Sequence, residues 1–263
     1  MATQQQTLKL PSERGREEPI YKPAVQPCSD IKNSATFIFL HGLADSAEAI
    51  QNVADQFQQG GKLSWMSWVL PNAKYNMDAM DTAWFIPHPL PTLAPSRPEL
   101  APDDDEEGML ETVAYLESLI DAVVESGVPL NRIVLGGFSQ GCAMSLLTHL
   151  TSSKYSGKLA GIVGLLGFLP LSDGKQRIQE LREEHGLPRL IEDDVPVFLG
   201  RGTSDALIAN RIWNYSLKGL TELGLKESQS EVHTYQGLTH TINGAVLRDV
   251  CVWLEKVVPS LES

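Results

Sequence analysis

A chain of 263 residues with 42% hydrophobic residues is long enough to bury one sizeable core. Its formal net charge of −12, without any cluster of Lys and Arg, argues against a nucleic-acid-binding surface. No apolar run can span a bilayer, and the polar stretch 1–18 does not fit a secretory signal. Three widely spaced cysteines suggest no disulfide framework. We therefore expect a cytoplasmic protein.

The chain begins with a polar segment, residues 1–34, rich in Gln, Glu, Lys and Pro, which predicts an irregular N-terminal arm. A single domain is expected over 35–263. The β-rich run 36–40 predicts its first buried strand. A helix is expected over 47–58, and a second strand over 65–70.

Residues 71–107 contain seven prolines, a density that excludes helix interiors and central strands. We expect a long structureless excursion that is either a functional loop or disordered, part of which packs down through Trp84 and Phe85. The acidic run 103–107 should begin a helix rather than bind a metal, because carboxylates favour the positive end of a helix dipole.

From this helix onward, strands and helices alternate. Strands are expected at 132–136, 159–166, 195–199 and 231–235, and helices at 140–150, 208–223 and 243–258. A charged insertion, 172–194, should contain one helix at 175–185. This alternation predicts an α/β fold with a mostly parallel central sheet and helices on both faces. Functional residues of such sheets lie at the carboxyl ends of the strands.

The run Gly137-Phe138-Ser139-Gln140-Gly141 has the pattern G-x-S-x-G between an expected strand and an expected helix. A nucleophile elbow requires this context, because the tight turn tolerates no bulky side chain at either glycine and lifts the serine oxygen above the sheet edge. The helix N-terminus favours developing negative charge. We predict Ser139 as a nucleophile. The alternative is an ordinary turn in which Ser139 merely caps the helix.

A nucleophilic serine needs a base and an orienting carboxylate, and on such a sheet the chain order is Ser, then Asp or Glu, then His. Asp205 and His240 each follow an expected strand, in loops that contain glycine. The rival acids at 193–194 precede their strand, and the rival His233 lies within one. We therefore predict Asp205 as the acid and His240 as the base.

Stabilisation of an oxyanion requires N–H donors near the serine. One is the amide of Gln140, and the second should follow an early strand, where we predict the amide of Leu43. His41 is expected to shape this loop rather than act as a base. No pair of histidines has metal-ligand spacing, so neither a metal nor a cofactor is expected.

Several segments resemble the phospholipase/carboxylesterase family of α/β-hydrolases, whose best-known members are the acyl-protein thioesterases. The likeness rests on Leu40-His41-Gly42-Leu43-Ala44-Asp45, on the stretch Asn131 to Gly141, on Gly167-Phe168-Leu169-Pro170-Leu171, and on the loops of Asp205 and His240. It runs from about residue 34 to the C-terminus, and the stretch around Ser139 is its most specific part.

The resemblance implies an α/β-hydrolase fold and a catalytic triad of Ser139, Asp205 and His240, with oxyanion donors at Leu43 and Gln140. The expected function is that of a serine hydrolase that cleaves a carboxylic ester or thioester through an acyl-enzyme. The substrate would be a small molecule, an acylated protein or a carrier-bound acyl chain.

The resemblance also implies that Trp84 and the Pro-rich loop border an acyl-binding groove. Six apolar residues would suit an aliphatic chain, although each type is common in cores: Trp84, Phe85, Phe168, Leu169, Leu207 and Leu238. This chain departs from the family pattern in the same loops, with Ala44 where a glycine is usual and Thr203-Ser204 before the acid. The resemblance therefore does not transfer a particular substrate.

Two other functions stay open. The same triad could pass its acyl group to a hydroxyl or an amine, which would form a lactone or a transferred ester. A non-catalytic ligand-binding homologue is the second alternative, although no member of the expected triad is missing. The sequence does not predict an oligomeric state.

Overall fold

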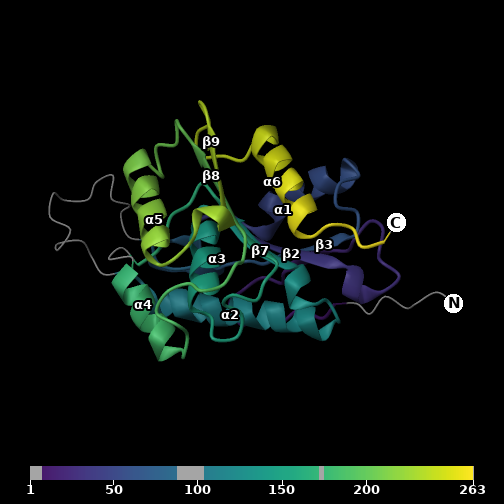
Figure 1. Ribbon diagram of the computed structural model, residues 1–263, viewed down its shortest axis with the longest axis horizontal. Coiled ribbons are helices and arrows are strands. Elements are labelled where there is room, and N and C mark those ends of the chain that lie inside the picture. The colour runs from purple at the N-terminus through teal and green to yellow at the C-terminus, as the bar shows by residue number, and fades with distance from the viewer. Residues whose placement is uncertain (1–7, 88–103, 172–174, 263) are drawn as a thin grey trace.

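A seven-stranded sheet is the centre of the molecule (Figure 1), with strand order β1-β3-β2-β6-β7-β8-β9. The computed structural model describes residues 8–87, 104–171 and 175–262. Six neighbouring strands run parallel. Their bounds are Ala35–Leu40 (β2), Met66–Leu70 (β3), Ile133–Phe138 (β6), Gly161–Leu165 (β7), Val197–Gly202 (β8) and Ser230–Tyr235 (β9).

Helices cover both faces of this sheet, which confirms the predicted α/β architecture. Helices α1 (Ala47–Gln59) and α6 (Gly244–Val257) bury side chains in the core on one face. The core on the other face is built by α2, α3, α4 and α5. These helices span Glu106–Glu125, Gln140–Thr151, Lys175–Glu184 and Asn210–Glu222.

Strand β2 shows how one run of residues supplies both cores. All six of its residues are buried, as expected for a central parallel strand covered on both faces. Successive side chains of a strand point to opposite faces. Ile38 and Leu40 accordingly join the core under α2 and α3, whereas Phe37 and Phe39 join the core under α1 and α6.

The prediction of an irregular arm over residues 1–34 needs a correction, because part of this segment has regular secondary structure. Strand β1 (Ile20–Lys22) pairs antiparallel with β3 and forms an edge of the sheet, and Ile31–Asn33 form a 3-10 helix. A three-residue strand is too short to show an alternating pattern in the sequence. This strand forms because its backbone groups pair with those of β3, which would otherwise be the unpaired edge of the sheet.

The Pro-rich segment also needs a correction over its first part. Lys74–Asn76 (β4) and Asp81–Ala83 (β5) pair as a small antiparallel hairpin instead of a structureless loop. After Pro71 the next proline is Pro87, so the intervening residues keep the N–H donors that strand pairing requires. The remainder of the expected loop, 88–103, lies outside the described residues.

The helix expected in the charged insertion is α4, and it packs against the end of α3. The Arg182 side chain, from a residue that is only 2% exposed, donates to the carbonyl of Leu150 at 2.6 Å and to that of Leu190 at 2.9 Å. His185 contacts the carbonyl of Thr151. The last carbonyls of a helix lack partners within it and favour cations. The insertion therefore caps the C-terminal end of α3.

His149 is a buried titratable residue in this region. It lies on α3 with 2% exposure, and neither ring nitrogen has a hydrogen-bond partner among the described residues. Burial lowers its pKa, against the opposing charge of Asp193 and with the help of Arg182. The folded protein therefore holds His149 neutral, whereas the unfolded chain protonates it near its ordinary pKa of about 6.5.

We expect His149→Leu to reduce the acid sensitivity of the fold. Because the folded pKa lies below the unfolded value, stability is complete above pH ~6.5 and falls with pH by at most about 1.4 kcal/mol per unit. Urea unfolding of the wild type and the variant at pH 7.5 and 5.5 measures this slope. His149→Gln is the control that removes titration but keeps polarity. Equal slopes in all three proteins would contradict the prediction.

Candidate active site

Three side chains at the carboxyl edge of the sheet form one hydrogen-bonded chain. Ser139 follows β6, Asp205 follows β8 and His240 follows β9. The Ser139 Oγ lies 2.9 Å from the His240 Nε2, and the His240 Nδ1 lies 2.8 Å from the Asp205 Oδ2. An ionised carboxylate only accepts hydrogen bonds, so Nδ1 donates to Asp205. In neutral His240, Nε2 is then free to accept the serine proton.

The backbone at Ser139 is held in an unusual conformation that exposes its side chain. Its φ is 56° and its ψ is −117°, and the side chain makes no capping hydrogen bond to α3 in the described part of the chain. A Cβ at Gly141 would lie 2.5 Å from the Leu40 carbonyl oxygen, and one at Gly137 would lie 2.5 Å from the Gly141 backbone. Both glycines are therefore required for this tight turn between strand and helix.

Asp205 is fixed as an anion behind the histidine. Its side chain is 1% exposed, and its Oδ1 accepts the amides of Leu207 and Ile208, both at 2.9 Å. Burial by itself would raise the pKa, but the hydrogen bonds from His240, Ile208 and Leu207 outweigh it and lower the Asp205 pKa. The His240 ring also packs on Phe138, with centroids 4.7 Å apart. The imidazole is therefore restrained by both a carboxylate and an aromatic ring.

The two candidate oxyanion donors belong to segments that meet at Ser139. Gln140 is the first residue of α3, where an amide has no helix carbonyl to bond. Leu43 lies in the loop after β2, and the neighbouring Gly42 is so near that a Cβ there would lie 3.3 Å from the Ser139 Cβ. The amide of Ala44, whose φ is 57°, donates to the Thr82 carbonyl at 2.9 Å and ties this loop to β5.

His41 fixes the shape of this loop, as its position in the motif suggested. It is fully buried, and its Nε2 accepts the Ala73 amide at 3.0 Å. The other ring nitrogen, Nδ1, therefore carries the hydrogen and donates to the Gly42 carbonyl at 2.7 Å. Burial lowers the pKa of His41, so the ring stays neutral. Both hydrogen bonds orient the segment that carries Leu43.

We expect His41→Phe to lower kcat by about 10²-fold, the effect of a disturbed oxyanion donor, with little change in KM. The His41 and Trp84 ring centroids lie 4.9 Å apart, and the phenylalanine of the variant should keep this aromatic contact. It leaves the Ala73 amide and the Gly42 carbonyl without their partners, which costs about 1–3 kcal/mol for each buried group. Steady-state kinetics with p-nitrophenyl acetate and urea unfolding measure the two effects. An unchanged kcat would contradict the role given to His41.

The Gln140 side chain has a second role that the sequence did not reveal. Its Oε1 accepts the Trp84 amide at 3.1 Å and its Nε2 donates to the Phe85 carbonyl at 3.2 Å. The Trp84 indole donates to the His41 carbonyl at 2.9 Å, and Thr112 donates to the Trp84 carbonyl at 2.6 Å. Residues 84–85 are therefore bonded both to the start of α3 and to the loop after β2.

The six apolar residues predicted to line a groove do not form one surface. Trp84, Phe85 and Leu169 are 2%, 5% and 5% exposed and belong to the core under α2 and α3. Phe168 packs at the edge of the same core and meets Phe85 edge to face, with ring centroids 6.4 Å apart. Of these four residues, Phe168 alone is partly exposed.

The other two predicted groove residues lie elsewhere. Leu238 is buried in the core under α1 and α6, on the opposite face of the sheet, and Leu207 is 54% exposed. The loops that carry these residues start at the same sheet edge, but Leu238 enters a core whereas Leu207 is exposed. Strand direction, which the sequence predicts, tells at which edge of the sheet a loop begins. Where a side chain of that loop lies depends on how the loop folds.

Arg16 is a further residue that sequence reasoning missed. Its guanidinium lies 4.1 Å from the Tyr115 ring centroid and 5.6 Å from that of Trp84, and it donates to the Asn72 carbonyl at 3.3 Å. Glu13 pairs with it at 2.6 Å. Such cation–π contacts are worth about 0.5–2 kcal/mol. The N-terminal segment thus contacts Trp84 through Arg16.

The described residues contain no group of three His, Cys, Asp or Glu side chains that could hold a metal ion. Among the helices that the structure describes, none has both the length and the apolar character needed to cross a bilayer. All three cysteines are free thiols.

The sheet topology together with the Ser139, His240 and Asp205 chain defines an α/β-hydrolase. The family model described as Phospholipase/Carboxylesterase matches residues 22–258, and the chain belongs to this family. It is accordingly a carboxylic ester or thioester hydrolase.

Similar proteins support membership of this family. Acyl-protein thioesterase 1 of Yarrowia lipolytica is 34% identical over 236 residues, which cover 89% of this chain and 96% of the relative. Acyl-protein thioesterase 1 of Cryptococcus neoformans is 36% identical over 242 residues, 84% of this chain and 92% of the relative. The crystal structure of Arabidopsis thaliana SOBER1 is 26% identical, with a TM-score of 0.69, and the match covers 86% of this chain and 99% of that structure.

Proposed function

We propose that this protein is an acyl-protein thioesterase that uses Ser139, His240 and Asp205 as a catalytic triad. The observation that carries the proposal is the continuous hydrogen-bonded chain from the Ser139 hydroxyl through His240 to the buried Asp205. The thioester substrate is supported by relatives named acyl-protein thioesterase 1 that are 34% and 36% identical. The intact triad argues against a non-catalytic binding protein.

In the proposed reaction the Ser139 Oγ attacks the acyl carbonyl while His240 Nε2 accepts its proton. Asp205 holds the histidine tautomer and stabilises the imidazolium that forms. The tetrahedral intermediate then collapses: the carbon–sulfur bond breaks, and His240 returns the proton to the leaving sulfur. Water, activated in turn by His240, releases the acyl group from Ser139 as a carboxylic acid.

The oxyanion of both tetrahedral intermediates needs donors in place before the reaction. We assign the amides of Leu43 and Gln140 to this task, supported by the closeness of Gly42 to Ser139 and by the position of Gln140 at the start of α3. Removing one such donor typically lowers kcat by about 10²- to 10³-fold. A cytoplasmic location is proposed as well, supported by the three free thiols.

A matched series of substrates tests this proposal. Peptides with the same sequence would carry acetyl, octanoyl or palmitoyl groups either on cysteine, as a thioester, or on serine, as an oxyester. We expect kcat/KM to be higher for the thioester than for the oxyester at each acyl length. A consistent preference for the oxyester, or release of lactone or transferred ester instead of the free acid, would contradict an acyl-protein thioesterase.

A further inference from the structure

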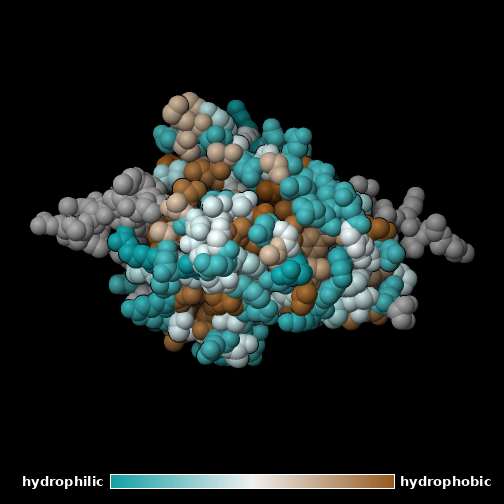
Figure 2. Space-filling view, turned by 90° about the horizontal axis from the view of Figure 1, so that it is seen from above, coloured by the Kyte–Doolittle hydropathy of each residue, from teal (hydrophilic) through white to brown (hydrophobic). Residues whose placement is uncertain are grey.

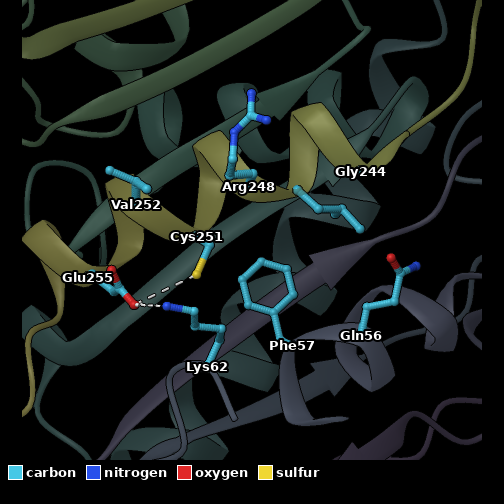
Figure 3. Close-up of a pocket in the computed structure, with 9 residues that line it drawn as sticks. Gln56, Phe57, Lys62, Gly244, Arg248, Cys251, Val252 and Glu255 are labelled. Carbon is cyan, nitrogen blue, oxygen red and sulfur yellow. Dashed lines mark hydrogen bonds and ion pairs between the residues drawn. The ribbon is translucent and has the colours of Figure 1, made fainter. Parts of the chain in front are cut away.

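A groove between helices α1 and α6 begins beside His240. Its first part is a hollow of about 190 Å³ whose wall includes His240, Thr241 and Asp45. A second hollow of about 280 Å³ continues along the helices (Figure 3). Gln56 and Leu247 line both hollows, so the two adjoin each other along α1 and α6. From the proposed catalytic histidine, the groove leads away along the face of the molecule covered by α1 and α6.

The groove has an apolar floor and a polar far end. Figure 3 shows the side chains of Phe57 and Cys251 facing each other across the space between the two helices. Lys62 and Glu255 form an ion pair of 3.5 Å at its far end. None of the residues predicted for acyl binding lines either hollow. The groove is therefore separate from the region of Phe85 and Phe168.

The direction of proton transfer decides which part of a substrate this groove receives. His240 must return the serine proton to the leaving atom, so that atom has to lie within hydrogen-bond reach of Nε2. Whatever is bonded to the leaving atom must then extend past His240. A hollow lined by His240, Thr241 and Ile242 lies there among the described residues. The acyl chain, bonded to the other side of the carbonyl carbon, does not have to pass His240.

The charges of the groove distinguish two kinds of leaving group. Its two cations are already paired, Lys62 with Glu255 at 3.5 Å and Arg248 with Asp249 at 3.2 Å. Asp45 adds a negative charge at the end next to His240. A leaving group rich in phosphate needs unpaired Lys or Arg side chains. These charges favour a polypeptide with neutral or basic residues beside the acylated cysteine.

We propose that the α1–α6 groove binds the polypeptide on the leaving-group side of the thioester. This inference rests on the proposed thioesterase function and adds the place where the acylated protein docks. Apolar and uncharged side chains next to the cysteine fit its Phe57 and Leu247 floor. The peptide leaves as a free thiol after the carbon–sulfur bond breaks, so the same groove also holds the first product.

Gln56→Trp tests the proposal, because Gln56 is exposed on α1 at the junction of the two hollows. Gln59→Trp is the matched control on the same helix, exposed and outside both hollows. Two substrates share one acyl group: a peptide S-octanoylated on cysteine, with neutral flanking residues, and S-methyl octanethioate. We expect Gln56→Trp to lower kcat/KM for the peptide about tenfold, mainly through KM, and to change the methyl thioester less than about twofold.

A second variant and a second measurement guard against a folding artefact. Asn52→Trp, also exposed and lining the first hollow, should reproduce the loss. The free-thiol peptide should inhibit the wild type competitively and inhibit Gln56→Trp more weakly. Thermal unfolding should show that both variants remain folded.

Several results would overturn the assignment. If Gln56→Trp lost kcat/KM equally on the peptide and the methyl thioester, the groove would bind the acyl chain instead. If kcat/KM fell on neither substrate, the groove would have no role in substrate binding. The groove would instead receive a phosphate-rich leaving group if two results were found together. The wild type would hydrolyse octanoyl-coenzyme A better than the peptide, and Gln56→Trp would lose this octanoyl-coenzyme A hydrolysis. A wild type inactive on every thioester would refute the proposed function itself.

Discussion

Replacing Ser139 by alanine should reduce ester and thioester hydrolysis by about 10⁴- to 10⁶-fold, the range expected when the nucleophile of a triad is removed. The fold should remain intact, because the Ser139 side chain makes no capping hydrogen bond to α3 in the described residues. Initial rates with p-nitrophenyl butyrate and with an S-octanoyl peptide measure the loss. Circular dichroism and thermal unfolding check the fold.

Ser204→Ala is a suitable control for this experiment. Ser204 is exposed and adjoins Asp205, and its amide donates to the Leu238 carbonyl through the backbone alone. We expect this variant to keep nearly full activity. A fluorophosphonate probe should label the wild type and Ser204→Ala but not Ser139→Ala. Wild-type turnover or labelling in Ser139→Ala would refute the nucleophile and with it the proposed mechanism.

Replacing Asp205 by asparagine should lower kcat by about 10⁴-fold through the tautomer of His240. The amides of Leu207 and Ile208 both need an acceptor at Oδ1, so the asparagine oxygen should remain there. Its NH₂ group then faces His240 Nδ1, which has to accept instead of donate. The hydrogen of the neutral ring moves to Nε2, which can no longer take the proton of Ser139.

The same substitution should change how stability depends on pH. Hydrogen bonds lower the Asp205 pKa below its unfolded value of 3.8. The stabilisation from this carboxylate is therefore complete above that pH and is lost as the pH falls through the lower, folded value. We expect the difference in unfolding free energy between wild type and Asp205→Asn to shrink on acidification below pH ~4.

Asp194→Asn is the control for both measurements. Asp194 pairs with Lys226 at 2.7 Å, but its side chain is 83% exposed, and exposed pairs contribute about 0–1 kcal/mol. Its replacement should leave kcat unchanged. If Asp205→Asn retained wild-type kcat, the carboxylate would have no role in orienting His240. A pH-independent stability difference would contradict the linkage.

The tertiary structure corrected the sequence-based predictions wherever a strand or a side-chain contact depended on a partner far along the chain. Strand β1 exists because the edge of β3 offers it hydrogen bonds. Arg16 matters because Trp84 and Tyr115 lie beside it. Neither partner leaves a periodic signal in the sequence near Ile20–Lys22 or Arg16. A short strand and a lone charged residue in a polar segment look the same whether or not they are packed.

The sequence by itself determined the α/β alternation and the positions of Ser139, Asp205 and His240 at one sheet edge. Strand and helix periods are local properties, and the carboxyl ends of parallel strands must meet at the same edge. Only the tertiary structure decided which face each loop side chain occupies, and it placed Leu238 and Phe85 in opposite cores. The physical reason is that the direction of a loop side chain depends on backbone turns and on neighbours from distant segments, which no local period encodes.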